Sequence, residues 1–331
     1  KSKVLSKIKT GQVHFKYDGN AESLKKFIKE NQHILIESTD RITQKMRERG
    51  GGLSKIKLVN KSKELKSYYQ LNVDFNTIDS MGANFINSCL EIISKKFKEL
   101  LNDSRQFKES EKKIEVIMSI LSNYTPRCIV ESSVECEIDD LGEIEGISSK
   151  EFAIKFKNAF DIANVDIGRA VTHNKGIMNG IDAVLISTGN DFRAVEAGIH
   201  AYASSKGKYK SLSECTIIDN IFKIKLKIPL SIGTIGGITD IHPMVRLSLK
   251  LLENPTSDKL MNIICSVGLA QNYAAVKSLV TSGIQKGHMK MHLINLLIKQ
   301  NATKNQIDKS EEYFRDKDIN SQSVKDFLDL N

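Results

Sequence analysis

The sequence has few cysteines, and they lack the spacings that disulfide frameworks and zinc sites need. The five cysteines are an odd number scattered over 331 residues, without a CxxC pair. This pattern disfavours a secreted disulfide scaffold and a structural zinc site, and it makes a reducing cytoplasm the natural compartment.

Long apolar runs are also missing. The longest uncharged stretch, Leu260 to Val276, is interrupted by Asn262, Gln271 and Asn272. It falls short of the roughly 18 apolar residues that a membrane-spanning helix needs, so we predict no transmembrane segment. No signal-peptide pattern is present, and the first residue is Lys1 rather than a methionine. We therefore expect the sequence to begin inside a longer polypeptide.

The positive charge does not form a basic patch typical of nucleic-acid binding. The net charge is +9, but the lysines are spread along the whole chain, and no basic helix interleaved with aromatic residues occurs. We interpret most of these lysines as a solvated surface and predict no nucleic-acid partner. A basic surface still suits an anionic ligand, such as a phosphate of coenzyme A (CoA) or of a dinucleotide.

Apolar periodicity predicts a compact α+β unit in the first third of the chain. Strands are predicted over Gln12 to Tyr17, Leu53 to Val59, Tyr68 to Phe75 and Ile114 to Leu121, with helical segments before the glycines at 50–52 and over Met81 to Leu100. The order β-α-β-β-α-β is that of the ferredoxin-like, split βαβ arrangement.

The remainder of the chain is predicted to be mostly helical. Helical patterns occur over Lys150 to Ala163, Asp191 to Ser204, Pro243 to Leu252, Lys259 to Val280 and Gln285 to Lys299, with a short helix at Ser323 to Leu328. We therefore predict four segments. They are the end of a large-domain segment (1–11), a small ferredoxin-like domain (12–122), a large helical domain (123–295) and a charged, mobile C-terminal flap (296–331).

One candidate site is the segment 79–84, which reads DSMGAN and stands at the predicted start of a helix. Asp79 is a good N-cap, and the free N–H groups of a helix start, with Gly82 allowing close approach, suit a dinucleotide phosphate. The simpler interpretation is an ordinary helix cap. The sequence lacks a GxGxxG motif, and the glycines of Gly233 to Gly237 do not have that spacing, which disfavours a Rossmann fold.

A second candidate site is the segment from Arg169 to Gly180, in which a cation, an imidazole, amides and glycines are concentrated. We interpret this stretch as too irregular for a core helix. Lys175 is a candidate for a buried ammonium that stabilises a developing oxyanion, a role that requires a nearby carboxylate. Asp191 is one candidate for that carboxylate, and the alternative is a helix cap at Asn190 or Asp191.

Two histidines, His288 and His292, stand four residues apart, which places them on one face of a helix. Metal sites use this spacing, but the sequence has neither the glutamate of an HExxH motif nor an obvious third ligand. A polar residue at a helix start, or a proton donor, is the simpler interpretation of His288. A metal-dependent hydrolase stays open as an alternative.

These segments together resemble the signature blocks of the 3-hydroxy-3-methylglutaryl-CoA (HMG-CoA) reductase family. The matching blocks, in family order, are Asp79 to Asn84 (DAMGAN type), Thr172 to Asn179 (THNKGIMN), Thr188 to Gly198 (TGNDFRAVEAG), Gly233 to Gly237, Leu269 to Asn272 (LAQN) and Gly283 to His292 (GIQxGHMxxH). The THNKGIMN and GHM blocks are typical of the soluble class II branch. The resemblance covers nearly the whole chain.

The resemblance implies a two-step, four-electron reduction of a thioester to an alcohol, which yields mevalonate and CoA. The small domain would bind the cofactor, which is NADPH or NADH with NADPH slightly favoured, and no metal is implied. The implied catalytic residues are Lys175, Asp191 and His288; the implied substrate-binding residues are Arg169, Asn179 and Gln271; and the implied cofactor-binding residues are Asp79, Met81, Gly82, Asn84 and Asn123. Lys175 would polarise the thioester and aldehyde oxygens, and His288 would protonate the departing thiolate.

The resemblance also identifies residues that this sequence does not contain. The family's ENVIG-type block, which carries a catalytic glutamate, precedes the block found here at Gly11 to Val13. The resemblance therefore implies that catalysis needs residues upstream of Lys1. It also implies a homodimer, or a multiple of dimers, in which the active sites are shared between subunits. The alternative from another class is a scaffold that binds CoA or a nucleotide without turnover.

Overall fold

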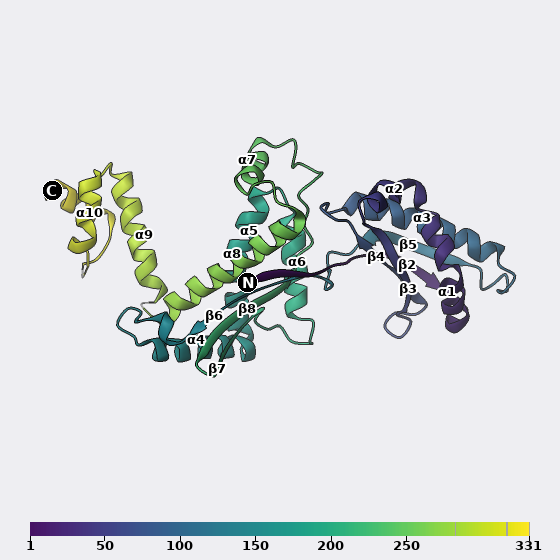
Figure 1. The fold of residues 1–331 in the computed structure, drawn as a ribbon, viewed down its shortest axis with the longest axis horizontal. Helices are drawn as coiled ribbons and strands as arrows, with labels where there is room; N and C mark the ends of the chain where they lie inside the picture. The colour runs from purple at the N-terminus through teal and green to yellow at the C-terminus, as the bar shows by residue number, and fades with distance from the viewer. Residues whose placement is uncertain (282, 316, 331) are drawn as a thin grey trace.

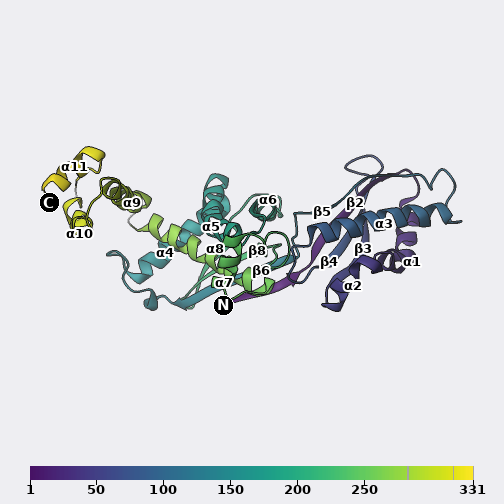
Figure 2. The same cartoon turned by 90° about the horizontal axis from the view of Figure 1, so that it is seen from above.

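The computed structural model describes residues 1–281, 283–315 and 317–330, with the side chains of 284–288 and 290 left aside. Figures 1 and 2 show three parts in a row. A four-stranded sheet with its helices forms one end, a second sheet with longer helices forms the centre, and a group of short helices forms the other end. The fold is α+β, as predicted.

The first sheet has the predicted ferredoxin-like topology. Its strands are β2 (Lys9–Tyr17), β3 (Gly52–Asn60), β4 (Tyr68–Asn76) and β5 (Ile114–Leu121), in the antiparallel order β3-β4-β2-β5. The helices α1 (Ala21–Glu37), α2 (Asp40–Glu48) and α3 (Ala83–Asp103) pack on it. Alternate residues of β2, such as Val13 and Phe15, are fully buried in a core of their own, so the strand has one apolar face.

The second sheet was not predicted, and the expectation of a mostly helical second half was incomplete. Its strands are β1 (Ser2–Lys7), β6 (Cys128–Glu137), β7 (Ser213–Ile218) and β8 (Ile221–Pro229), in the antiparallel order β1-β6-β8-β7. In β8 the buried Phe222, Ile224 and Leu226 alternate with lysines, which is a strand signal visible in the sequence.

Pairing of β1 with β6 explains how the two units are connected. The chain leaves the second sheet after Lys7, builds the first sheet, and returns at Cys128 to pair with β1. The ferredoxin-like unit is therefore inserted between two adjacent strands of the larger unit. The predicted boundary at 122 falls between β5 and β6, although the exact domain limits stay a prediction.

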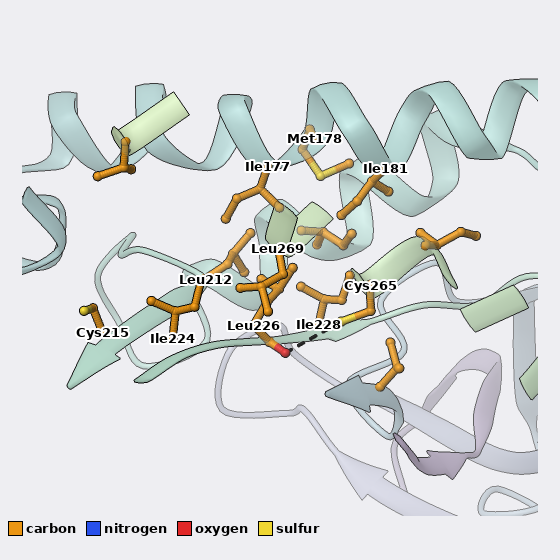
Figure 3. Close-up of a cluster of buried hydrophobic side chains, with 14 of the residues drawn as sticks. Ile177, Met178, Ile181, Leu212, Cys215, Ile224, Leu226, Ile228, Cys265 and Leu269 are labelled. Atoms are coloured by element: carbon orange, nitrogen blue, oxygen red, sulfur yellow. Dashed lines mark hydrogen bonds between the residues drawn. The ribbon is translucent and has the colours of Figure 1, made fainter. Parts of the chain in front are cut away.

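The helices α4 (Ser149–Val165), α5 (Ile167–Ser187), α6 (Phe192–Ala203), α7 (Pro243–Leu251) and α8 (Ser257–Val280) belong to the larger unit. Figure 3 shows part of its core, in which Ile177, Met178 and Ile181 of α5 face Leu226 and Ile228 of β8. By length and composition α8 alone among the described helices could cross a membrane. Its packing against α5, β6 and β8 is a sufficient reason for its apolar face.

The interpretation of Arg169 to Gly180 as irregular was wrong, because the whole segment lies within α5. Its glycines misled the prediction, since glycine is unfavourable in a helix interior. Here they allow α5 and α8 to cross closely: a Cβ at Gly180 would lie 3.0 Å from the Cβ of Gln271, and one at Gly268 would lie 2.9 Å from Ile181.

The C-terminal part contains α9 (Ile284–Lys299), α10 (Lys304–Tyr313) and α11 (Ser321–Leu330). The helix predicted at Ser323 to Leu328 is confirmed as α11, whereas α10 was missed because it has few apolar residues. Its sequence signal was the capping box formed by Thr303 and Gln306. Phe314, Val324 and Phe327 build a small separate core, and the mobility of this flap stays a prediction.

Candidate active site

The turn before α3 differs from the prediction at Asp79. The N-cap of α3 is Gly82, in the left-handed conformation with φ of 81°, so Asp79 does not cap this helix. Instead its Oδ1 accepts a hydrogen bond of 2.7 Å from the backbone N of Ser257, in the first turn of α8. The N–H groups at the start of α8 lack intrahelical partners, which explains why a carboxylate is favourable there. Asp79 therefore ties the inserted unit to the larger one.

Two glycines make this turn possible. A Cβ at Gly82 would lie 2.5 Å from Cγ2 of Thr77, and a Cβ at Gly233 would lie 2.4 Å from the backbone N of Met81. Both distances are shorter than real Cβ contacts, so any larger residue at either position would force neighbouring atoms to move. The backbones of the segments 79–84 and 233–237 are thus packed against each other without an intervening side chain.

Hydrogen bonds join three of the motifs found in the sequence. The backbone N of Thr234 donates to the carbonyl of Asp79 at 2.8 Å, and Ser80 pairs with Ile235 in an isolated parallel bridge. The backbone N of Gly233 donates to Oδ1 of Asn190 at 2.9 Å. Asp79 and Asn190 are about 110 residues apart, and Asn190 and Gly233 are about 40 residues apart, yet their segments meet. This is expected for a site that is assembled by tertiary structure.

These three segments enclose a cleft of about 420 Å³. The first turn of α3 opens into it, and this turn contains no acidic side chain to occupy the free N–H groups. An anion is favoured at such a helix start by the hydrogen-bond donors and by the helix dipole. The cleft residues from the predicted sets are Met81, Gly82, Asn84 and Asp191. The geometry fits a phosphate of a dinucleotide.

Asn123 lies beside the cleft, on the other side of Met81. Both residues line a small adjoining hollow with Gly198 of α6. A Cβ at Gly198 would lie 2.7 Å from the backbone oxygen of Asn123, so this glycine allows the β5–β6 connection to approach α6. Of the five predicted cofactor residues, four lie at or beside the cleft, and Asp79 stands behind its wall.

Asp191 is the N-cap of α6, which confirms the cap interpretation. Its Oδ1 accepts from the backbone N of Ala194 at 3.2 Å and lies 3.5 Å from Nε of Arg193. The residue also lines the cleft, so the cap and a role in the site are compatible.

Lys175 does not lie beside Asp191 within one chain. Lys175 is an exposed residue of α5, and Asp191 follows the end of that helix at Ser187. The axial distance from Lys175 to Ser187 is about 18 Å at the rise of an α-helix. Any contact between the two side chains therefore needs a second copy of the chain or a large rearrangement.

The predicted substrate residues lie on α5, which also carries Lys175, and on the neighbouring α8. Asn179 is exposed one turn after Lys175, on the same face of α5. Gln271 is exposed on α8, where that helix crosses α5 at Gly180. Arg169 is in the first turn of α5. The catalytic lysine candidate thus belongs to the α5–α8 crossing, and the cofactor candidates belong to the cleft.

The side chain of His288 lies outside the described residues, so its predicted role is not placed. His292 is exposed on α9. This helix follows α8 in the chain. At the rise of an α-helix, α8 is about 36 Å long from Ser257 to Val280. Within the part of the chain that the structure describes, no three histidine, cysteine or acidic side chains gather as metal ligands.

A buried polar network supports α5 and was not identified from the sequence. Nε2 of His173 lies 2.8 Å from Oγ of Ser213 and 3.1 Å from Nδ2 of Asn272, and Ser213 donates to Oδ1 of Asn272 at 2.8 Å. Burial, with a smaller effect of the Arg169 charge, lowers the pKa of His173 to about 4. The neutral imidazole thus links α5, β7 and α8 beneath the exposed face that carries Lys175.

This network predicts a pH-dependent stability. Between pH 6.5, where an unfolded histidine titrates, and about pH 4, the unfolded state binds more protons, so the folded state loses stability as the pH falls. His173→Gln, whose neutral amide can reach Ser213, removes this loss, which is up to about 3 kcal/mol. Denaturant unfolding of both proteins at about pH 7.5 and about pH 4.5 measures it. Parallel stability changes in the two proteins would contradict the assignment.

The fold and the site define a class of protein: an α+β protein in which an inserted ferredoxin-like unit and a larger unit enclose a cleft at a helix start. The family is established by comparison. A model of hydroxymethylglutaryl-coenzyme A reductase matches residues 1–293, and the chain belongs to this family.

Individual relatives agree with this assignment. The chain is 37% identical over 254 residues to the 3-hydroxy-3-methylglutaryl-coenzyme A reductase of Archaeoglobus fulgidus, a match that covers 76% of this chain and 54% of that protein. The chain spans about half the length of the curated relatives that it matches.

Solved structures from Streptococcus pneumoniae have the same fold. One reductase structure has a TM-score of 0.77 at 33% identity, and the match covers 99% of this chain and 76% of that one. A structure of the class II enzyme bound to NADPH in open conformations also has a TM-score of 0.77, at 34% identity, covering 85% of this chain and 73% of that one.

Proposed function

We propose that the full-length protein is a soluble, cytoplasmic, NADPH-dependent HMG-CoA reductase. The observation that carries the proposal is the convergence of the segments 79–84, 189–191 and 233–237 on one cleft, in a chain that belongs to this family. The free start of α3 supplies anion-binding N–H groups at this cleft. NADPH is favoured over NADH because a class II relative of the same fold is described with NADPH bound.

The proposed reaction consists of two hydride transfers to the same carbon. The first hydride converts the thioester carbonyl to a tetrahedral oxyanion, which collapses to an aldehyde as the CoA thiolate leaves and takes up a proton. The second hydride, with a further proton, converts the aldehyde to the primary alcohol of mevalonate. NADPH supplies both hydrides, so two cofactor molecules are oxidised for each substrate molecule reduced.

The proposed residue roles are those that the family resemblance implies, and the charges of the residues agree with them. Lys175 stabilises negative charge on the carbonyl oxygen in both steps, and Asp191 keeps that ammonium charged and oriented. His288 protonates the departing thiolate. Arg169, Asn179 and Gln271 hold the substrate around the α5–α8 crossing.

We further propose that the active site is completed by a second copy of the chain. Lys175 and the cleft with Asp191 are separated along α5, so one chain does not unite them. The face of α5 around Lys175 also exposes Val171, and Ile167 and Ile186 are exposed towards the two ends of the helix. An exposed apolar surface beside polar site residues is typical of an interface.

Nicotinamide absorbance tests the proposed function. Full-length protein mixed with HMG-CoA is expected to oxidise NADPH, and to do so faster than NADH. A folded dimer that binds either nucleotide without oxidising it would instead favour the non-catalytic scaffold. The hydrolase alternative would require bound zinc and CoA release without nicotinamide oxidation.

A further inference from the structure

A buried lysine lies at the junction of the two units, directly behind the cofactor cleft. Lys9 begins β2 and is only 3% exposed. Its Nζ donates to Oγ1 of Thr77 at 2.7 Å, to the carbonyl oxygens of Ser80 and Met81 at 2.8 and 2.9 Å, and more weakly to that of Ile232 at 3.4 Å. One side chain from β2 therefore contacts the 79–84 segment and Ile232, which directly precedes the 233–237 segment.

The surroundings of this ammonium are unusual for a buried charge. Its hydrogen-bond partners are three carbonyl oxygens and one hydroxyl, and none of them is a carboxylate. Burying a charge without an opposite charge is unfavourable, so lysine is rarely found in such a place. Burial lowers the pKa of Lys9 to about 8, so the amine is still mostly protonated at neutral pH.

The turn that Lys9 contacts has a strained backbone. Ile78 has a φ of 52°, a left-handed conformation that β-branched residues rarely adopt. Gly82 is also left-handed and lies against Thr77. Thr77 donates its hydroxyl hydrogen to the carbonyl of Ser80 at 2.6 Å while its oxygen accepts from Lys9. Strain of this kind persists only where surrounding contacts hold it, and it is concentrated at functional sites.

Lys9 also contacts the opposite wall. Ile232 precedes Gly233, whose backbone N donates to Asn190 and whose Cα packs on Met81. The carbonyls of Met81 and Ile232 both point at one ammonium, so their separation is set by the reach of that group. The width at the base of the cleft depends on this cation.

We propose that Lys9 is a positioning residue for the dinucleotide: its ammonium holds the Thr77–Gly82 turn against the 232–233 segment in the conformation that accepts the cofactor phosphates. This inference rests on the proposed cofactor function of the cleft. Lys9 is behind the wall and does not act on the reacting atoms. Its loss should therefore weaken cofactor binding more than substrate binding or the chemical step.

The test is to replace Lys9 by methionine, which keeps the aliphatic stem and removes the donors. In the full-length protein we expect Lys9→Met to raise the Kd and KM for NADPH by about 10-fold or more, because several charge-assisted hydrogen bonds are lost. The KM for HMG-CoA and the kcat at saturating NADPH should change by less than about threefold. Lys16→Met, at an exposed position of the same strand, is the matched control.

A second pair of variants tests the same contact if Lys9→Met does not fold. Thr77→Val removes the hydroxyl that lies between Lys9 and Ser80 but keeps the shape of the side chain, whereas Thr77→Ser keeps the hydroxyl. We expect weaker NADPH binding for Thr77→Val and near-normal binding for Thr77→Ser. NADPH affinity equal to that of the wild type in every variant that folds would overturn the proposal. An equal loss for NADPH and HMG-CoA would also overturn it, because it indicates a merely structural role.

Amide hydrogen exchange separates this inference from the proposed function. If Lys9 holds the turn, the amides of residues 78–82 lose protection in Lys9→Met and keep it in Lys16→Met, whether or not the protein turns over. Unchanged protection would overturn the positioning role. A wild-type protein that binds neither NADPH nor NADH would instead reject the proposed function, while the exchange result would still decide whether Lys9 holds the turn.

Discussion

Replacing Lys175 by methionine is expected to abolish most of the reductase activity of the full-length protein while leaving ligand binding nearly intact. The ammonium is proposed to act on a charge that develops only in the transition state, so its removal lowers kcat by about 100- to 1,000-fold. The Kd values of HMG-CoA and NADPH should change by less than about threefold. Lys206→Met, in an exposed loop, is the control for loss of one surface charge. Unchanged kcat in Lys175→Met would reject the assignment.

Mixing two inactive variants extends this prediction to the proposed dimer. Lys175→Met and Asp191→Asn remove groups that are separated along α5, so each variant keeps what the other lacks. If a site takes Lys175 from one copy and Asp191 from the other, subunit exchange restores one intact site in each mixed dimer. An equimolar mixture should then regain about a quarter of wild-type activity. If subunit exchange is demonstrated and activity does not return, the result indicates that each active site takes Lys175 and Asp191 from the same chain.

Replacing Gly233 by alanine is expected to cause the second large loss, this time in cofactor binding. The added Cβ would lie 2.4 Å from the backbone N of Met81 and 2.9 Å from the carbonyl carbon of Ser80. Main-chain atoms cannot rotate away as a side chain can, so the two cleft segments must separate. Overpacking of this kind costs about 1–3 kcal/mol, which corresponds to a loss of about 5- to 150-fold in NADPH affinity if the whole cost falls on the bound state.

A matched glycine controls for the change of residue type. At Gly168 the nearest atom to an added Cβ is Oδ2 of Asp166 at 3.4 Å, which is ordinary contact. Gly168→Ala should therefore bind NADPH as the wild type does, as measured by nicotinamide fluorescence titration. If Gly233→Ala bound NADPH equally well, the close approach of the two segments would have no role in the cleft.

The first sheet was predictable in part because the residues of its strand β2 alternate between a buried and an open face. Val13, Phe15 and Tyr17 show this pattern within a single strand. The second sheet has an equally clear alternation in β8, but its neighbours are distant in the sequence: β8 pairs with β6, about 90 residues earlier. Only helices were predicted in this part of the chain, and the alternation in β8 was not used.

Local propensity could not predict that Ile167–Ser187 forms one continuous helix, α5. Its two internal glycines and its polar residues resemble a loop until the crossing with α8 is known, because only that contact explains why a side chain is excluded at Gly180. Tertiary packing overrides propensity at such positions. The hydrogen bond from the backbone N of Ser257 to Asp79 was unpredictable for the same reason, since the two residues are 178 positions apart.

The site was predicted as separate motifs, and their grouping required the fold. The family resemblance identified the segments 79–84, 188–198 and 233–237, and the structure brings parts of all three to one cleft. It also separates Lys175 from Asp191, which the sequence had linked as neighbours. The position of Lys9 could not be predicted, because one lysine among many carries no sequence signal until its burial and its carbonyl partners are known.

The stoichiometry of the reaction tests the central claim most directly. Full-length protein would be incubated with a limiting amount of HMG-CoA and excess NADPH until absorbance stops changing, and mevalonate, free CoA and oxidised cofactor would be quantified. The account predicts two molecules of NADPH oxidised for each molecule of mevalonate and of CoA formed. Formation of CoA without NADPH oxidation, or no consumption of HMG-CoA by a folded dimer, would contradict it.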